Sequence, residues 1–422
     1  MLNEGQQNAL DRALETSEHL TISGPAGSGK SFLTKYIIEG LKAKMKRFAL
    51  AAPTHQAKIV LAGMSGEDAC TIHSLLKIHP DTYEDQRMFE QSEVPDLAGL
   101  DVLLIDEASM YDDDLVNIML NTLPKSCRII AIGDKDQIQP VRHADGHLSP
   151  LFDLFECVYL DEIVRQAANN PLIQVATEIR EGGWFRTNWD RATKCGMFHI
   201  PDSMKMINQF LKVIKTPEDL LNYRMFAFTN KNVDILNGFI RQHVYKTDLP
   251  FVDGEYLVLQ QPVSKTNGKF SEIVLNNGEI VRIINEPEPV LFALTLPRME
   301  TEHVEVAFLE VEQEEGDIQE VCVLWGEEAE KTFGRFMFRA SNEYKGLAAS
   351  RNRKMMWQAF WALKDRMVDT KSLGASTLHK AQGITIKGAA IYTADLDYAD
   401  PCLRKQLAYV GSTRAEKWCL FY

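Results

Sequence analysis

Short apolar runs that end in polar residues alternate with helix-patterned segments over the first 170 residues of the chain. The runs are HLTISG, RFALAAP, DVLLIDEA and RIIAIGD, and the first is followed by SFLTKYIIEGLKAK, whose apolar positions have helical spacing. This alternation predicts a parallel sheet with helices on both faces. Because open parallel sheets bind ligands at the carboxyl ends of their strands, we expect functional residues directly after these runs.

A second α/β block begins near Pro171 and is split into two parts. RMFAFTN predicts a strand, VDILNGFIRQHVY predicts a helix, and the pattern resumes in GASTLHKAQG, GAAIYTA, QLAYVGSTRA and WCLFY. No sequence repeat is visible, but the related rhythm of the two blocks makes them candidates for structural duplicates.

Between about residues 246 and 340 the pattern changes to short alternating strands with the turn signals TNGK, LNNGE and NEPEP. EIVLNNGEIVRII predicts a β-hairpin with an Asn-Gly turn. Residues 341–366 return to a helical pattern that clusters Met355, Met356, Trp357, Phe360 and Trp361. This region therefore predicts a small β-barrel followed by helices.

Length and composition are those of a multidomain globular protein. The 422 residues favour two to four domains. No apolar run approaches the roughly 20 residues that span a bilayer, and the acidic, amphipathic start is unlike a secretory signal. The seven cysteines are scattered without a CxxC pair, which indicates neither a zinc ribbon nor a disulfide framework and favours a reducing cytosol.

The net charge of −13 is concentrated in one stretch of the chain. Glu300 to Glu330 holds twelve acids and no Lys or Arg, so outside it 47 acids face 46 Lys and Arg. The following stretch, Lys331 to Lys371, has ten Lys and Arg against three acids. Basic surface is therefore available for phosphates, although a solvated acidic face beside a solvated basic one fits the charge pattern equally well.

A glycine-rich loop carries the most specific chemistry in the chain. GPAGSGKS fits the pattern G-x-x-x-x-G-K-[ST] and lies between a predicted strand and a predicted helix. Its glycines let backbone amides face phosphates, Lys30 is predicted to reach the β- and γ-phosphates, and Ser31 to ligate Mg²⁺. The expected cofactors are ATP and Mg²⁺, and the predicted ATP-binding loop comprises Gly24, Pro25, Ala26, Gly27, Ser28, Gly29, Lys30 and Ser31.

Polar residues at the ends of two further predicted strands, together with two arginines, are of the types that ATP hydrolysis requires. Asp106 is predicted to hold Mg²⁺, directly or through water, and Glu107 to orient and deprotonate the attacking water. Gln137 follows the next strand and is predicted to hydrogen-bond the γ-phosphate. Arg165 and Arg414 are candidates to stabilise the charged transition state. Because Arg414 lies in the second block, it reaches the nucleotide only across a cleft that opens and closes with ATP state.

Taken in order, these motifs resemble those of the superfamily 1 helicases. The set is GPAGSGKS, LAAPTHQAK, TIHSLL, LLIDEASM, IGDKDQIQPV, FAFTN, STLHKAQG and YVGSTRA, and it covers most of the chain except roughly 246–370. Within the superfamily the chain resembles the RecD-like group and, more narrowly, phage helicases of the Dda type, through NEGQQNAL, APTH, FEQSEVPDL and the pair Trp357 and Trp361. The resemblance implies 5′→3′ translocation on single-stranded DNA, work in DNA replication or recombination, and a phage protein in the host cytoplasm.

The resemblance also implies roles for individual residues. Gln6 is expected to read the adenine edge, and Gln382 and Gly383 to couple the grip on DNA to the nucleotide. Small polar and basic side chains at strand ends suit phosphate and sugar contacts, which carry no sequence information. The expected DNA contacts in the two α/β blocks are Pro53, Thr54, His55, Thr71, His73, Asn230, Thr377, His379 and Lys380.

Two aromatic features outside these motifs are candidates for contacts with bases. Residues 79–99 interrupt the first domain, and the resemblance implies a β-hairpin pin that splits the duplex with Phe89 near its tip; a surface loop is the alternative. Trp357, Phe360 and Trp361 share a helix face. Trp361 is expected to stack on a base while the others pack, and a purely hydrophobic seam between helices is the alternative.

Together these observations predict two RecA-like domains with inserts. The first covers residues 1–170, the second covers 171–245 and 372–422, and 246–371 form an SH3-like barrel and helices. The expected function is ATP-dependent unwinding at single-stranded DNA and duplex junctions, with the 300–330 acidic tract either repelling DNA or engaging a partner such as a replication protein. A remodeller that displaces proteins from DNA, a P-loop kinase and an RNA substrate remain alternatives.

Overall fold

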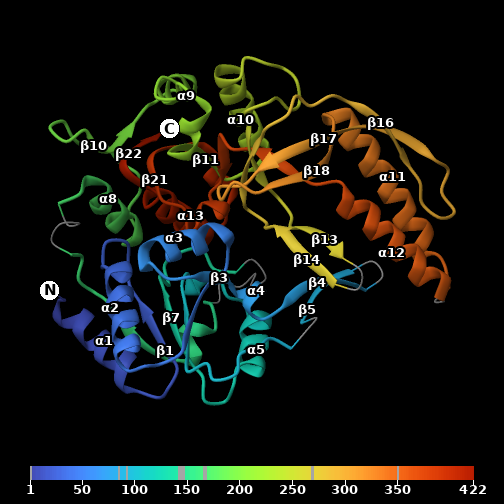
Figure 1. The fold of residues 1–422 in the computed structure, drawn as a ribbon. Helices are drawn as coiled ribbons and strands as arrows, with labels where there is room; N and C mark the ends of the chain where they lie inside the picture. The colour runs from blue at the N-terminus through green and yellow to red at the C-terminus, as the bar shows by residue number, and fades with distance from the viewer. Residues whose placement is uncertain are drawn as a thin grey trace. The chain divides into compact units, whose positions relative to one another are not determined.

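The computed structural model describes residues 2–83, 86–91, 94–140, 148–164, 169–267, 270–348 and 351–422. The chain forms two compact units, of which the first comprises Met1–Lys77, Glu93–Phe239 and Gly374–Tyr422, and the second Ile78–Ser92 and Ile240–Leu373. Two parallel sheets with their helices make up the first unit, and antiparallel sheets with two long helices make up the second (Figure 1). The domain boundaries expected at residues 170, 245 and 371 stay predictions.

The first sheet has six parallel strands in the order β3-β2-β6-β7-β1-β8. The four apolar runs of the first block form β1, β2, β6 and β7, and the central strands β1, β6 and β7 are buried along their whole length, as expected when both faces of a sheet are covered. The strands are β1 (Leu20–Ser23), β2 (Phe48–Ala52), β3 (Ala69–Thr71), β6 (Val102–Ile105), β7 (Arg128–Gly133) and β8 (Glu156–Tyr159).

Helices α1, α2 and α3 share one hydrophobic core with this sheet. Helix α1 starts with a reciprocal capping box between Asn3 and Gln6, and Thr54 caps α3 through its hydroxyl group. The helices of this part are α1 (Glu4–Glu15), α2 (Lys30–Ala43), α3 (His55–Ser65), α4 (Ile72–Leu75), η1 (Ala108–Met110), α5 (Asp113–Thr122) and α6 (Leu151–Leu154).

The second sheet repeats the topology of the first. Numbered by their order along the chain, five strands in each sheet lie in the order 3-2-4-5-1, with β8 (parallel) or β9 (antiparallel) added beside strand 1. The second block is therefore a structural duplicate of the first, and the prediction of two RecA-like domains is confirmed. Its strands are β9 (Asn188–Asp190), β10 (Cys195–His199), β11 (Tyr223–Ala227), β20 (Ala375–Thr377), β21 (Ile386–Ile391) and β22 (Ala415–Phe421).

Helices α8 and α13 pack together on one face of the second sheet. Helix α9 contacts β21 and β22. The helices of this part are α8 (Pro171–Arg180), α9 (Ser203–Leu211), η2 (Pro217–Leu221), α10 (Asn230–Val244), η3 (His379–Ala381), η4 (Thr393–Tyr398) and α13 (Pro401–Ser412).

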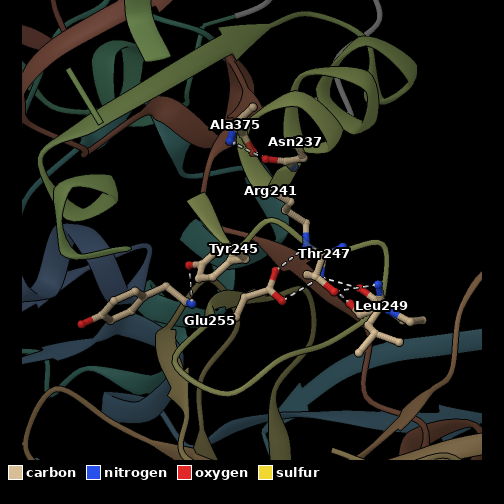
Figure 2. A network of polar contacts seen from close by, with 9 residues as sticks. Asn237, Arg241, Tyr245, Thr247, Leu249, Glu255 and Ala375 are labelled. Atoms are coloured by element: carbon tan, nitrogen blue, oxygen red, sulfur yellow. Dashed lines mark hydrogen bonds and ion pairs between the residues drawn. The ribbon is translucent and has the colours of Figure 1, made fainter. Parts of the chain in front are cut away.

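Helix α10 spans the boundary between the two units and carries a polar network (Figure 2). Asn237 accepts a hydrogen bond from Ala375 N at 2.6 Å and donates one to Ala375 O at 3.3 Å. One turn later, Arg241 forms a bidentate ion pair with Glu255 at 2.7 and 2.9 Å, and the Glu255 side chain is 1% exposed. Removing one partner of such a buried pair costs about 3–5 kcal/mol, so the pair firmly holds the turn that leads into the β-rich region.

The second unit contains an antiparallel sheet in the order β16-β17-β15-β12-β19, with β18 paired to β17. These strands are β12 (Tyr256–Leu259), β15 (Ile280–Ile283), β16 (Val290–Leu294), β17 (Glu302–Glu312), β18 (Ile318–Leu324) and β19 (Thr370–Ser372). The acidic tract supplies β17, where Val304 and Val306 are buried while Glu305 and Glu310 are exposed. Its acids thus form the solvent face of a barrel strand.

The predicted hairpin in EIVLNNGEIVRII is wrong. Gly278 does form a turn with φ +79°, but β14 (Phe270–Leu275) pairs with β13 (Val263–Asn267), while β15 pairs with β12 and β17. The difference arises from pairing with a strand that is distant in the sequence. Leu259 N donates to Glu279 O and Gly278 N donates to Leu259 O, so β12 occupies the edge of β15 that β14 was expected to cover.

The helical part of the insert also starts earlier than predicted. Helix α11 spans Glu327–Lys345 and α12 spans Arg351–Arg366, so the strand pattern ends near 324 and not near 340. Three glutamates in the first turn of α11 suit the positive end of a helix dipole. Phe336, Ala340 and Tyr344, at helical spacing, are buried against Trp357 and Phe360 of α12.

A β-hairpin insert in the first domain is confirmed. Strands β4 (Ile78–Tyr83) and β5 (Gln86–Gln91) pair antiparallel, with Tyr83 opposite Gln86 at the turn. Phe89 lies opposite Pro80, in the half of the hairpin away from the turn, so its expected position near the tip is wrong. Among the described residues, no helix combines the length and the apolar character that a membrane span requires.

Candidate nucleotide and DNA site

The glycine-rich loop joins β1 to α2 and is shaped by Gly29, which caps α2 with φ +80°. This backbone conformation favours glycine, and a Cβ atom at this position would lie 2.5 Å from Gln6 Nε2, so any other residue would also displace the Gln6 amide. Gln6 is 3% exposed, donates to Ser28 O at 2.9 Å and accepts from Asn3 N at 3.1 Å. The structure therefore places the predicted adenine contact directly against the predicted phosphate loop.

Lys30 lies within the curve of this loop. Its ammonium group donates to Gly24 O at 2.5 Å and to Pro25 O at 3.1 Å. A phosphate oxygen is a charged acceptor and binds an ammonium more strongly than a carbonyl oxygen does. When a nucleotide binds, Lys30 is thus positioned to give up its hydrogen bonds to the Gly24 and Pro25 carbonyl oxygens and to donate to phosphate oxygens instead.

Asp106 and Glu107 follow β6 as two adjacent, half-buried carboxyl groups. Glu107 N donates to Asp106 Oδ1 at 2.9 Å, and Glu107 has φ +53°, a left-handed conformation that is uncommon outside glycine and that clusters at functional sites. Burial raises the pKa of Asp106, while Lys30 lowers it. Burial and then the Asp106 charge raise the pKa of Glu107 to about 7, against the opposing charges of Arg414 and Lys30.

This pair of carboxyl groups fits a divalent cation. The Asp106 charge disfavours ionisation of Glu107, and a cation offsets that repulsion as well as the charge on phosphate oxygens. Asp106 and the hydroxyl group of Ser31, at the start of α2, would hold Mg²⁺. Glu107 has the raised pKa that suits a general base near neutral pH.

The loop after β7 connects the two sheets through Tyr409 of α13. The Tyr409 hydroxyl donates to Asp134 Oδ2 at 2.6 Å and accepts from Ala26 N of the glycine-rich loop at 2.9 Å. Gln137 is 6% exposed, and its Oε1 has no hydrogen-bond partner within the described part of the chain. The sequence prediction missed Tyr409 and Asp134, although both lie inside recognised motifs.

Arg414 is buried and oriented by the backbone of its own domain. Nε donates to Val410 O at 2.9 Å, and Nη1 donates to Ala381 O at 3.1 Å and Ile384 O at 3.3 Å. Burial lowers the pKa of Arg414 and the Glu107 carboxylate raises it, so the two predicted catalytic groups interact electrostatically. Arg165 lies outside the described residues.

Gln382 and Gly383 lie where the second domain meets the first. Gln382 Nε2 donates to Ile138 O, next to Gln137, at 2.9 Å. Gly383 has φ +72°, and a Cβ atom there would come 3.1 Å from Ala57 of α3. Both residues therefore lie against the first domain, and their coupling role stays a prediction.

The predicted DNA contacts follow equivalent strands of the two sheets. In the first sheet they follow strands 2 and 3 (β2 and β3), and in the second sheet they follow strands 2 and 3 again (β11 and β20). Each pair of strands is parallel and adjacent, so its carboxyl ends lie at one edge. The residues brought together in this way are Pro53, Thr54, His55, Thr71 and His73 in the first domain, and Asn230, Thr377, His379 and Lys380 in the second.

Several of these side chains already have local roles. The hydroxyl groups of Thr54 and Thr71 accept backbone N–H groups and cap α3 and α4. Burial lowers the pKa values of His73 and His379, which favours the neutral form of both imidazoles. Lys380 is exposed, and its contact with a DNA phosphate stays a prediction.

Asp395 organises the loop before Asn230, and the sequence prediction missed it. Its carboxylate is 1% exposed and accepts hydrogen bonds from Phe228 N, Thr229 N, Thr229 Oγ1 and Asn232 Nδ2. An acidic residue in ADLDY carries no distinguishing pattern, because its partners lie more than 160 residues away.

Comparison with known proteins identifies the family. Residues 1–200 match an AAA domain, and residues 248–372 match the Dda helicase SH3 domain. The whole chain aligns with 99% of the ATP-dependent DNA helicase dda of Enterobacteria phage T4 at 41% identity. The chain belongs to the Dda family of superfamily 1 DNA helicases.

More distant relatives agree with this placement. The ATP-dependent RecD2 DNA helicase of Deinococcus radiodurans is 32% identical over 43% of this chain and 24% of that protein. A Pif1 helicase from a structural study of DNA unwinding at forked double-stranded DNA matches with a TM-score of 0.53 at 17% identity, over 100% of this chain and 92% of that one. Bacteroides Pif1 bound to single-stranded DNA matches with a TM-score of 0.52 at 17% identity and the same coverage. The two structures show that the fold is shared.

The Trp361 side chain of this Dda-family helicase lies in the core of the helical pair. It is 8% exposed, packs edge-on against Phe360, and has Lys364 Nζ 4.8 Å from its ring centre. Stacking of Trp361 on a base stays a prediction, and it would require the ring to leave this packing.

We expect Trp361→Ala to lower the free energy of unfolding by about 3–5 kcal/mol, because a large buried ring is replaced by a cavity. Urea denaturation measures the change. Met355→Ala on the same helix is the control, since Met355 is 57% exposed, and should change stability by less than about 0.5 kcal/mol. Unchanged stability with weaker binding of single-stranded DNA would instead favour base stacking.

Tyr409→Phe should lower the free energy of unfolding by about 1–3 kcal/mol, because the buried Asp134 carboxylate loses its hydroxyl donor. Denaturation of the unliganded protein measures this. Tyr398→Phe is the matched control, since Tyr398 is 79% exposed. Equal stability of the two variants would mean that the contact between Tyr409 and the loop contributes nothing.

Proposed function

We propose that this helicase uses ATP and Mg²⁺ to translocate 5′→3′ along single-stranded DNA and to unwind duplex at junctions. The observation that carries the proposal is the duplicated sheet, in which predicted DNA contacts follow strands 2 and 3 of both copies. The nucleotide residues follow strands 1, 4 and 5 of the first copy. The direction rests on the resemblance to RecD-like helicases.

Hydrolysis follows from the residues around the glycine-rich loop. Lys30 and the loop amides bind the phosphates, and Mg²⁺, when bound, offsets charge on the phosphate oxygens. Glu107 accepts a proton from the attacking water. Arg414 supplies positive charge from the second domain, so hydrolysis needs the two domains to be closed. Gln137, with its buried and unpartnered oxygen, reports the presence of the γ-phosphate.

Translocation follows because one nucleotide controls the distance between two sets of DNA contacts, one in each RecA-like domain. Gln382 contacts Ile138 and lies two residues from Lys380, so closure of the domains around the nucleotide moves the DNA contacts of the second domain. The DNA contacts of the first domain, at the starts of α3 and α4, keep their place in that domain. Opening and closing of the two domains therefore moves one set of DNA contacts relative to the other along the strand.

Strand separation is assigned to the hairpin of β4 and β5. Separating one base-pair step costs on average about 1.4 kcal/mol, which is well below the free energy that ATP hydrolysis supplies. Unwinding therefore depends on how hydrolysis is coupled to movement and is not limited by energy. The hairpin bearing Phe89 would meet the duplex as the strand is drawn past it.

We expect single-stranded DNA to stimulate ATP hydrolysis, and duplexes with a 5′ single-stranded tail to be unwound while those with a 3′ tail are not. The ATPase rate with and without oligothymidylate and strand release from the two tailed duplexes measure this. Stimulation without release would contradict unwinding and favour a protein-displacing remodeller. Release from the 3′ tail alone would reverse the assigned direction, and stimulation by RNA alone would change the substrate.

A further inference from the structure

A cavity of about 740 Å³ lies on the second sheet, on the face opposite α8 and α13. Alternate side chains of a strand point to opposite faces. In β22, Cys419 and Phe421 join the core under α8 and α13, whereas Trp418 and Leu420 line the cavity. The cavity is therefore separated by the sheet from Tyr409 and the nucleotide loops, and it contains none of the predicted site residues.

The centre of the cavity is apolar, and the Trp418 ring is packed closely there. Trp418 stacks on Tyr223 with ring centres 5.7 Å apart. A Cβ atom at Gly388 would lie 2.2 Å from the Trp418 ring, so this glycine lets the indole lie against the neighbouring strand. The apolar lining is completed by Trp189, Phe198, Ile200, Val213 and Leu420.

One aromatic side of the cavity is open to solvent. Phe198 is 44% exposed and contacts Trp189 edge-on, with ring centres 6.3 Å apart. An exposed aromatic group beside a concave apolar surface is the usual anchor region of a protein interface. The volume is also within the range of pockets that enclose a ligand or one or two large side chains.

The rim of the cavity is basic. Lys194, Lys205 and Lys212 line it, and no carboxylate is among its lining residues, all of which the structure describes. Asp190 and Asp202, which are close to these lysines along the chain, take part in local structure: Asp190 accepts from Thr193 Oγ1, and Asp202 caps α9 by accepting from Lys205 N. In a chain of net charge −13, this rim is a local site of positive potential.

We propose that this cavity binds an acidic peptide segment of a partner protein, with one bulky apolar side chain inside and carboxylates against Lys194, Lys205 and Lys212. Single-stranded DNA fits less well, because such sites follow the backbone along a groove and stack successive bases. Here a single cavity has aliphatic as well as aromatic walls, and two of its rings already contact each other. The proposal does not depend on the direction or the mechanism of translocation.

The test uses the full chain and a fluorescein-labelled octapeptide of aspartates with one central phenylalanine. We expect saturable binding by fluorescence anisotropy, at least tenfold weaker for a peptide with alanine in place of phenylalanine. The double variant Lys205→Glu/Lys212→Glu should weaken binding at least tenfold, and Phe198→Ser should weaken it several-fold. ATP hydrolysis stimulated by single-stranded DNA should be unchanged in both variants.

Lys215→Glu is the matched control, because Lys215 is an exposed lysine close to Lys212 that does not line the cavity. Absence of binding up to millimolar peptide, or equal binding by the double variant and by Lys215→Glu, would overturn the proposal. So would a loss of oligothymidylate affinity in the double variant, which would assign the surface to nucleic acid. Concentration-dependent self-association that the double variant abolishes would assign it to a second copy of the chain.

Discussion

Glu107→Gln should lower kcat for DNA-stimulated ATP hydrolysis by about 10²–10⁴-fold, the range expected for loss of a general base. Glutamine keeps the size of the side chain and removes both the proton acceptor and one of two adjacent, half-buried negative charges. Nucleotide affinity should therefore be retained or increase slightly. Steady-state hydrolysis and titration with a fluorescent ATP analogue separate the two effects.

Glu67→Gln is the matched control for this substitution. Glu67 is in the same domain, but its carboxylate pairs with Lys42 near the surface and away from the nucleotide loop. Its rate should stay within about twofold of the wild type, as expected for a surface ion pair. A Glu107→Gln rate within threefold of the wild type would exclude Glu107 as the base.

Arg414→Lys should lower kcat by about 10³-fold, near the lower end of the range for removal of an arginine finger. Lysine retains a positive charge but has no planar fork of donors, so it cannot contact the carbonyls of Val410, Ala381 and Ile384 together. The charge that acts on Glu107 would then be mispositioned. Single-turnover hydrolysis at saturating ATP measures the chemical step.

Arg404→Lys in helix α13 is the control, because Arg404 forms an exposed ion pair with Asp397. Its rate should match that of the wild type. Because Arg414 is buried, each rate is taken per folded molecule, with unfolding followed in parallel. A wild-type rate in fully folded Arg414→Lys would mean that the charge alone is sufficient, or that Arg414 has no catalytic role.

The nucleotide loops were predictable because each motif is contiguous and follows a strand. The loop from Gly24 to Ser31 and the pair Asp106 and Glu107 depend on local backbone geometry, which a short sequence specifies directly. The parallel pairing of the strands followed from the same alternation of apolar runs and helical segments. The structure added that both sheets use the order 3-2-4-5-1, which relates the predicted DNA contacts of the two domains.

The β-rich insert was predicted less well, because antiparallel pairing is decided by partners that are distant in sequence. The Asn-Gly turn at Gly278 was real, yet β15 pairs with β12 and β17 and not with β14. The same is true of Trp361, whose burial depends on Phe360 and on the packing of α11 against α12. Helical spacing indicated that Trp357, Phe360 and Trp361 share one face of a helix, but it did not show which residues pack against that face.

The sequence by itself determined the class of the fold and the family, and it predicted the residues of the nucleotide loops, because these depend on contiguous motifs. Only the tertiary structure revealed the contacts that join the domains, such as Tyr409 with Ala26 and Asp134, and Gln382 with Ile138. It alone assembled the basic-rimmed cavity from β9–β10, α9 and β22. The physical reason is that such contacts join residues more than 200 positions apart, whose proximity depends on how the sheets and helices pack.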